Sequence, residues 1–347
     1  LLPLPALLWA GLPPIEALAT NKLQCSFGTA SATLHFLRHG SIDLRCVAPD
    51  STGPRPAELE RQPKTFGPAQ LYLAQRLARV LDVERPDLVI FTGDVIGGRD
   101  ARDPRAAWRM ATAPLVARGL PWCAVFGNHD DECGTARAQL LCLQQEIPGC
   151  LTRSGPSQVS GLGNFFLRIR AARGKATAAL LCCLDSNSYA ETAIGGYGWV
   201  REDQLRWFNR SLRRQRPAAD AASPPVLVFL HIPLPEYNDV WQQGGCLGEK
   251  NEDICCPRIN TGLFAAMHLA GNVRGVFAGH DHLNDFAGTL HGIGLCYGRA
   301  TGFNTYGRDG FQRGARIIRL QEDNPNFTTW LRLEDGSRID HLSPHRT

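Results

Sequence analysis

Short apolar runs alternate along the chain with longer stretches in which apolar residues recur every three or four positions. Four of the short runs indicate buried strands, because their consecutive positions are almost all apolar and a polar motif follows each run directly. They are Val89–Thr92, Ala124–Phe126, Val226–Leu230 and Val276–Ala278.

The longer stretches have the spacing of amphipathic helices. We expect helices at residues 73–85, from about residue 106, at 135–146, 202–216 and 261–270, with a long loop from 232 to 259. Further strands are predicted at 164–170, 178–184, 290–298, 315–320 and 327–333. Helices that alternate with strands predict an α/β layered core, and the late run of short strands predicts a second, partly antiparallel sheet.

The chain shows no internal repeat and no change of composition that resembles a domain linker. Its two candidate boundaries are the apolar start and the loop before Pro68, which is rich in proline, glycine and charge. We therefore divide the 347 residues into a signal-peptide-like segment (1–19), a divergent N-terminal segment (20–67) and one main domain (68–347).

The first segment resembles a secretory signal peptide, with an apolar stretch over Leu1–Leu12 and the cleavage-site pattern Ala17-Leu18-Ala19. It is too short and too rich in proline to span a membrane, and no other uncharged apolar run is long enough. The 12 cysteines, an even number, favour some disulfides in an oxidising compartment. Asn209 and Asn326 begin glycosylation sequons. We therefore expect a glycoprotein that is secreted or held in an endomembrane or vacuolar compartment.

Composition narrows the class of protein. A hydrophobic content of 44% and a charged content of 20% are those of an ordinary globular protein. The net charge of +4 is small for this length, so no nucleic-acid partner is expected. The arginines at 210–216 are interpreted as a solvated helix face.

The polar motifs after the four buried strands carry the candidate chemistry. In chain order they are Gly93-Asp94, Gly127-Asn128-His129-Asp130, His231 and Gly279-His280-Asp281-His282. Open α/β sheets place their functional sites at such strand ends. Taken singly, the histidines suit a hydrogen-bonded core position, Asp94 a helix N-cap and Asn128 a turn. Four such coincidences in one chain favour a shared metal site.

The residue types specify the metals and the reaction. The carboxylate of Asp94 can bridge two cations, the amide of Asn128 offers a neutral oxygen, and the imidazoles of His231, His280 and His282 offer nitrogens. This mixture suits two Fe, Zn or Mn ions better than Ca or Mg, which prefer oxygen ligands. Two such ions activate a bound hydroxide and hold a phosphate ester for in-line attack.

Two residues beside the ligands are candidate catalytic groups. His129 follows Asn128 directly, so its imidazole can protonate the leaving oxygen or stabilise the charge of the transition state. Asp130 is expected to orient that imidazole.

The order of the motifs resembles the calcineurin-like metallophosphoesterases. Within that family, Phe91–Asp94, His231–Glu236, Cys255–Pro257, His282–Phe286 and Leu295–Gly298 are similar to the purple-acid-phosphatase-29-like branch of plants and algae. The resemblance covers residues 68 to 333. It implies a four-layer αββα sandwich of two mixed β-sheets flanked by helices, with a dimetal site at the shared end of the sheets.

The family pattern also implies roles for the ligands. Asp94 would bridge both metals, Asn128, His231 and His280 would complete one site, and His282 would belong to the other. The resemblance weakens at the first motif, where the family has Asp-x-His and this chain has Thr33-Leu34-His35. His35 is then either a ligand of the second ion or part of an unrelated terminus.

A second departure concerns the metal. Purple phosphatases carry a tyrosine three residues after the motif aspartate, whereas this chain has Gly97 there, so no tyrosinate–iron charge transfer is expected.

The leading hypothesis is a metallophosphoesterase that hydrolyses phosphomonoesters with a metal-bound hydroxide at a dinuclear site. The alternative is a catalytically impaired pseudo-phosphatase that retains one metal, because Thr33 replaces the first aspartate. A nucleotide-binding protein is a third possibility, supported by Gly161-Leu162-Gly163 alone. The partner expected is a phosphate-ester substrate, and the oligomeric state does not follow from the sequence.

Overall fold

The computed structural model describes the backbone of residues 32–36 and residues 77–99, 101, 103–132, 134–172, 176–215, 223–302, 305–322 and 324–340. Its twelve labelled strands are β1 (Ala32–Phe36), β2 (Leu88–Phe91), β3 (Trp122–Ala124), β4 (Phe165–Arg170), β5 (Thr177–Cys183), β6 (Val226–Phe229), β7 (Val273–Ala278), β8 (Ala287–Leu290), β9 (Ile293–Tyr297), β10 (Gly314–Gln321), β11 (Asn324–Leu333) and β12 (Arg338–Ile339). The labelled helices are α4 (Pro104–Val116), α5 (Arg137–Gln145), α6 (Glu202–Arg214), α7 (Glu236–Gln243) and α8 (Leu263–Ala270), and residues 77–84 are also helical.

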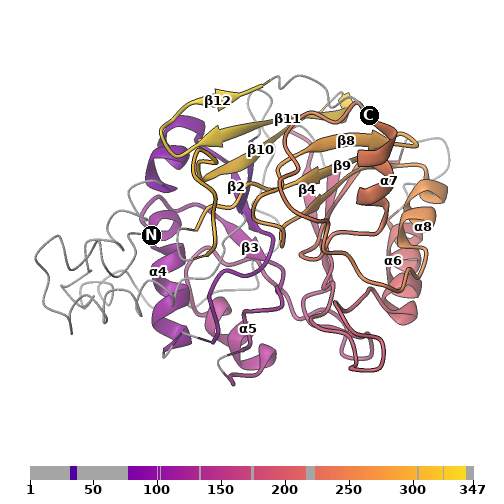
Figure 1. Ribbon diagram of the computed structural model, residues 1–347, viewed down its shortest axis with the longest axis horizontal. Helices are drawn as coiled ribbons and strands as arrows, with labels where there is room; N and C mark the ends of the chain where they lie inside the picture. Colours follow the sequence, from indigo (N-terminus) through magenta and orange to yellow (C-terminus); the bar gives the residue numbers. More distant parts are fainter. Residues whose placement is uncertain are drawn as a thin grey trace, which may run out of the picture.

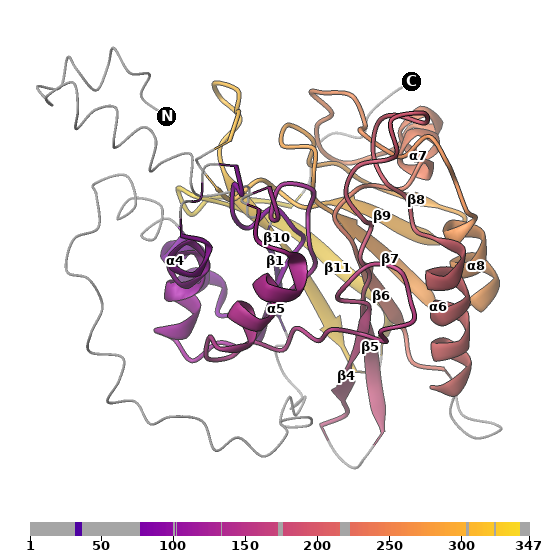
Figure 2. The ribbon, with the colours of Figure 1, turned by 90° about the horizontal axis from the view of Figure 1, so that it is seen from below.

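The strands form two six-stranded sheets. The first has the order β12-β11-β10-β1-β2-β3 and the second β4-β5-β6-β7-β9-β8. Figure 2 shows the layers side by side: α4 and α5, the first sheet, the second sheet, and then α6, α7 and α8. This is the predicted αββα sandwich, and it is confirmed.

Alternation along each strand explains how both faces of a sheet are filled. In β2, Val89 and Phe91 pack toward the helices of the first layer, whereas Leu88 and Ile90 face the core between the sheets. In β6, Val226 and Val228 likewise pack with the helices of the outer layer. Because successive side chains of a strand point to opposite faces, strands that are covered on both sides become continuous apolar runs. That is the pattern seen in the sequence.

The late strands differ from the prediction. The hairpin of β8 and β9 joins the second sheet, where β9 pairs in parallel with β7, whereas β10, β11 and β12 join the first sheet. They therefore complete both sheets and do not form a sheet of their own (Figure 1). The stretch predicted as a long loop from 232 to 259 also contains the helix α7.

Strand β1 comes from the N-terminal segment that the sequence analysis set apart from the main domain. It lies between β10 and β2, parallel to β10 and antiparallel to β2. In this register Ala32 pairs with Phe91 and His35 pairs with Leu88. His35 is thus beside the beginning of β2, whereas the metal-ligand motif follows its end.

Two further expectations concern the compartment. No helix in the described ranges has the length and apolarity required to cross a membrane. The nine described cysteines are free, so the expected disulfides do not occur among them, and Cys25, Cys46 and Cys133 lie outside the described residues. The signal-like segment and its cleavage pattern also lie outside the described residues.

Candidate metal centre

The turn after β2 carries Asp94 into the centre of the site. Its backbone is left-handed, with φ of 91° at Gly93 and 51° at Asp94. A side chain at position 93 would collide with His231, because a Cβ there would lie 2.4 Å from Nδ1 of that histidine. Glycine adopts positive φ without steric cost, whereas an aspartate held there indicates a constraint typical of functional sites.

The loop after β3 lies against this turn. A Cβ at Gly127 would lie 2.1 Å from Oδ1 of Asp94, so only glycine allows the two loops to touch. The same Oδ1 accepts a hydrogen bond from the backbone N–H of His129 at 2.8 Å. Asn128, which lies between Gly127 and His129, is 1% exposed, so its amide group is buried.

Asp130 ties the two loops together. Its carboxylate accepts hydrogen bonds from the backbone N–H groups of Gly127 at 2.8 Å, Asp94 at 2.9 Å and Ile96 at 3.1 Å. Burial and the nearby charge of Asp94 raise the pKa of Asp130 to about 6. The prediction that Asp130 orients His129 is therefore wrong, since its oxygens hold the backbone of the ligand loops.

Glu132 takes the place predicted for Asp130. Its Oε2 lies 2.8 Å from Nδ1 of His129, and the His129 side chain is 41% exposed. This contact favours the tautomer with the proton on Nδ1 and fixes the plane of the ring. The sequence analysis did not identify Glu132, although its spacing of three residues from His129 was available as a signal.

His231 follows β6 and is fully enclosed. Its Nδ1 donates to the carbonyl oxygen of Thr92 at 2.7 Å. Because a carbonyl only accepts, the neutral imidazole carries its proton on Nδ1 and presents a lone pair on Nε2. That Nε2 lies 3.0 Å from Oδ1 of Asn128, 3.1 Å from Oδ2 of Asp94 and 3.1 Å from Nδ1 of His280.

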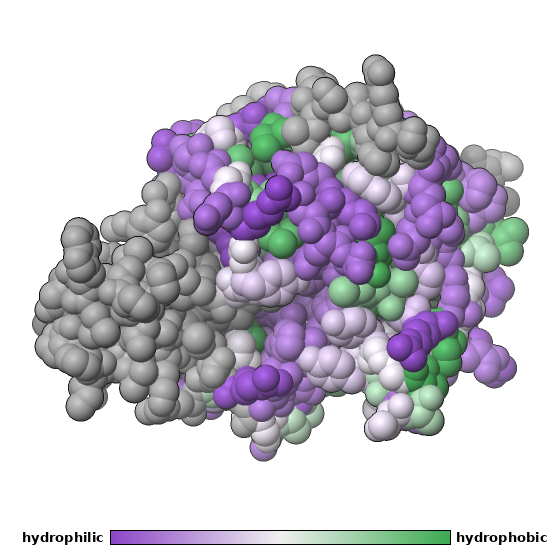
Figure 3. Space-filling view, in the orientation of Figure 1, coloured by the Kyte–Doolittle hydropathy of each residue, from purple (hydrophilic) through white to green (hydrophobic). Residues whose placement is uncertain are grey.

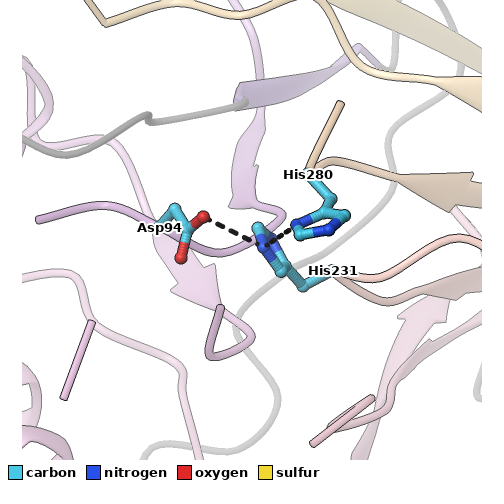
Figure 4. A group of neighbouring side chains, drawn as sticks. All are labelled: Asp94, His231 and His280. Carbon is cyan, nitrogen blue, oxygen red and sulfur yellow. Dashed lines mark hydrogen bonds and ion pairs between the residues drawn. The ribbon is translucent and has the colours of Figure 1, made fainter. Parts of the chain in front are cut away.

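These four side chains converge on one point, and Figure 4 shows three of them, Asp94, His231 and His280, directed toward one another. The ligand atoms of these three lie within 4.8 Å of one another. Oδ2 of Asp94 is buried, and the polar atom observed beside it is Nε2 of His231 at 3.1 Å. Several lone pairs facing one another are unfavourable unless a cation lies between them, so the donor set fits a metal ion. One carboxylate, one amide and two imidazoles suit Zn, Fe or Mn.

Burial acts to lower the pKa of His231, but the negative charge of Asp94 outweighs it and leaves that pKa raised. Burial acts to raise the pKa of Asp94, but the charge of His231 outweighs it and leaves that pKa lowered. Burial, together with repulsion from His231, holds the pKa of His280 well below its ordinary value. The site therefore combines an ionised carboxylate with a neutral imidazole.

His282 is buried near the site but is not among these contacts. It is 7% exposed, its Nδ1 pairs with the hydroxyl of Thr305, and its ring stacks on Tyr306 with 4.2 Å between centroids. Burial lowers the pKa of His282 to about 3, so it too is neutral. In the described part of the chain, His282 is not within ligand distance of two other His, Cys, Asp or Glu side chains.

A buried ion pair supports the loop of Asn128. The guanidinium of Arg137 donates to both oxygens of Asp185 at 2.9 Å and to the carbonyl oxygen of Gly127 at 2.7 Å. Asp185 is 0% exposed and lies two residues after the end of β5. The sequence analysis missed this pair, although an aspartate directly after the apolar strand 178–184 repeats the signal of the other four motifs.

The structure thus brings Asp94, Asn128, His231 and His280 into direct contact and places His129 beside them. His282 is near but makes no direct contact with these four that we observe. The backbone register does not bring His35 to the site. A second group of possible ligand atoms, from Cys255, His280 and Asp281, also lies within 4.8 Å and was not predicted.

Comparison with known proteins agrees with this geometry. A family model described as calcineurin-like phosphoesterase matches residues 34–284. The chain is 33% identical over 291 residues to a probable inactive purple acid phosphatase 29 of Arabidopsis thaliana, covering 77% of this chain and 74% of that protein. It is 34% identical to the probable inactive purple acid phosphatase 14 of the same plant, covering 75% of this chain and 71% of that protein.

Among solved structures, a dimetal phosphatase from Danio rerio covers 90% of this chain and 99% of its own, with a TM-score of 0.53 and 16% sequence identity. This similarity shows a shared fold. With the family match over most of the chain and the two plant relatives, it establishes that the protein belongs to the calcineurin-like phosphoesterase family.

Proposed function

We propose that the protein hydrolyses phosphomonoesters at a dinuclear metal centre. The single observation that carries the proposal is the convergence of Asp94, Asn128, His231 and His280 around Nε2 of His231, with contacts of 3.0–3.1 Å. Bound there, Fe, Zn or Mn ions supply a Lewis acid that polarises a phosphate and lowers the pKa of water. All other steps of the proposed hydrolysis are assigned to side chains of the protein itself.

His129 is proposed, in its protonated imidazolium form, as the proton donor to the leaving oxygen. Its Nδ1 is engaged by Glu132, so Nε2 is the nitrogen that can face a substrate. Its partial exposure, at 41%, leaves the ring within reach of a phosphate ester held at the ligands. Backbone contacts from Asp130 fix the two loops, so the donor and the ligands keep their relative positions.

The test is an assay of the purified full chain after removal of metal and reconstitution with Mn, Zn or Fe. A phosphomonoester and the corresponding diester are compared at equal concentration. We expect metal-dependent release of phosphate from the monoester and slower hydrolysis of the diester. Hydrolysis that survives a strong chelator, or the absence of hydrolysis with every metal, would refute the proposal.

A second candidate function is that of an impaired phosphatase that retains one metal. The observation that favours it is the register of β1, which pairs His35 with Leu88 and so separates His35 from the end of β2 that leads to Asp94. The same assay decides between the two candidates. One tight metal without turnover supports the impaired protein, whereas turnover that rises with added metal supports the enzyme.

We further propose that the protein is secreted or held in an endomembrane compartment. The proposal is supported by the signal-like pattern of residues 1–19 and by the exposure of Asn326, which begins a sequon on β11. Expression in a host that glycosylates proteins, followed by mass analysis, tests it. A glycan on Asn326 and a mature chain that begins near Thr20 are the expected results, and an unmodified protein recovered from the cytosol would contradict them.

A further inference from the structure

Tyr306 packs its aromatic ring against His282, a predicted ligand of the second ion. The ring stacks on His282 with 4.2 Å between centroids and 30° between planes. Its hydroxyl donates to Oε2 of Glu252 at 2.6 Å, which fixes the orientation of the ring. The residue is nevertheless 53% exposed, so part of the ring is open to solvent.

A second tyrosine lies beside the proposed proton donor. The ring of Tyr189 is edge-on to His129, with 6.4 Å between centroids, and stacks on Tyr197 at 6.0 Å. Its hydroxyl accepts a hydrogen bond from Nδ2 of Asn128 at 2.8 Å and lies 3.4 Å from Oε1 of Glu132. Tyr189 is 49% exposed and therefore also presents an open ring surface beside the site.

These two rings are unusual on the surface of this protein. The exposed large apolar side chains in the described part of the chain are Val83, Tyr189, Leu247, Leu269 and Tyr306. The two aromatic members of this set each contact a histidine of the site, although they come from separate loops. Outside the grey atoms, the face seen in Figure 3 is largely hydrophilic, with its hydrophobic residues in small separate patches.

The chemistry of the two rings selects a class of ligand. An aromatic face that is held in place and open to solvent interacts best with another planar aromatic ring, by stacking or by an edge-to-face contact. A saturated group of the same size gains only contact area. Because both phenols are held by hydrogen bonds, little rotamer freedom is lost when a ring binds.

We propose that Tyr189 and Tyr306 form an aromatic-binding subsite, and that the substrates are phosphate esters whose organic group carries a planar aromatic ring. This inference rests on the proposed phosphoesterase function, because the metal centre would hold the phosphate while the tyrosines hold the ring. His129 lies beside Tyr189, which places the subsite next to the group that would protonate the leaving oxygen.

The test compares benzyl phosphate with cyclohexylmethyl phosphate on the metal-loaded full chain. Both are esters of primary alcohols, so the pair differs mainly in whether the ring is aromatic. We expect kcat/KM to favour benzyl phosphate by roughly 10-fold in the wild type, from two aromatic contacts of ordinary strength. Both esters use the same metal ligands, so damage to the metal centre lowers both kcat/KM values equally. The ratio of the two values is then unchanged.

Variants assign the preference to the tyrosines. Tyr306→Leu and Tyr189→Leu should each reduce the ratio by about 3-fold, and the double variant should bring it close to 1. Tyr306→Phe keeps the ring and loses only the bond to Glu252, so it should retain the preference. Leu269→Ala, at an exposed apolar position on α8, is the control and should leave the ratio unchanged.

Binding of benzylphosphonate and cyclohexylmethylphosphonate, measured by calorimetry, separates this inference from the proposed function. If neither ester is hydrolysed, the proposed function fails, and tighter binding of benzylphosphonate still supports the subsite. Equal kcat/KM for the two esters in the wild type, or equal binding of the two phosphonates, would overturn the subsite. A preference that persists in the double leucine variant would overturn it as well.

Discussion

The two sides of the metal centre differ in how completely the chain builds them. On one side, Asp94, Asn128, His231 and His280 converge within hydrogen-bond distance of Nε2 of His231. On the other side, His282 is held by Thr305 but lacks a comparable set of neighbouring ligands in the described residues. We infer that the first side can bind a metal ion as it stands, whereas the second depends on a ligand from elsewhere.

Strand direction explains this difference. The ligands of the complete side follow β2, β3, β6 and β7, and the pairs β2–β3 and β6–β7 are parallel, so their ends meet at one edge. The missing ligand of the other side was expected from β1. That strand is antiparallel to β2, so it runs away from the ligand edge and His35 pairs with Leu88 at the beginning of β2.

The largest expected effect comes from Asp94, the carboxylate that we propose bridges the two ions. Asp94→Asn keeps the shape but removes the negative charge, so we expect loss of bound metal and a fall in kcat/KM of more than about 100-fold. Elemental analysis and the phosphatase assay measure the two effects. Asp103→Asn is the matched control, because Asp103 caps α4 and asparagine caps helices equally well. Metal content equal to that of the wild type would exclude Asp94 as a ligand.

Substitution of His129 should impair catalysis without affecting metal binding. His129→Ala is expected to lower kcat by about 100-fold while the metal content stays unchanged, because the ring donates a proton and binds no metal. Glu132→Gln keeps a hydrogen-bond acceptor but loses the charge, so a smaller fall of about 10-fold is expected. Full activity in His129→Ala would remove this residue from the mechanism, and loss of metal would make it a ligand.

The two sides of the centre should bind metal ions with unequal affinity. Titration of the metal-free protein should show one tight ion and a second that binds at least about 10–100-fold more weakly, since a missing ligand costs more than a missing supporting contact. His282→Ala should affect only the second ion, whereas His231→Ala should abolish the tight one. Two equally tight ions in the unmodified chain would show that another carboxylate completes the second side.

The complete side of the centre was predictable from the sequence, because its signal is local. Each ligand directly follows an apolar run, and the order of the motifs matched a known family. The late strands show the limit of such reasoning, since β9 and β10 have similar apolar patterns yet belong to different sheets. Pairing partners depend on contacts between distant segments, which the pattern of a single strand does not encode.

The supporting residues were missed for a related reason. Tyr189 bonds to Asn128 across 61 residues, and Arg137 bonds to Asp185 across 48. Tyr189 and Arg137 are of types that are common on surfaces, so nothing in their own neighbourhood marks them, whereas Asp185 follows an apolar run as the ligand motifs do. For Asp130 the types and spacing were compatible with either role, and only the positions of the backbone N–H groups of Asp94 and Gly127 show which one it takes.

The smallest expected effects concern the first motif. In the observed register His35 pairs with Leu88, three residues before the end of β2 at Phe91, which is about 10 Å of strand. Thr33 pairs with Ile90, inside the strand. We therefore expect His35→Ala and Thr33→Asp each to change the affinity for the second ion by less than about 2-fold, measured by the same titration. Tighter binding of that ion in Thr33→Asp would show that β1 runs parallel to β2 in solution, and the two sides of the centre would then differ by a single carboxylate.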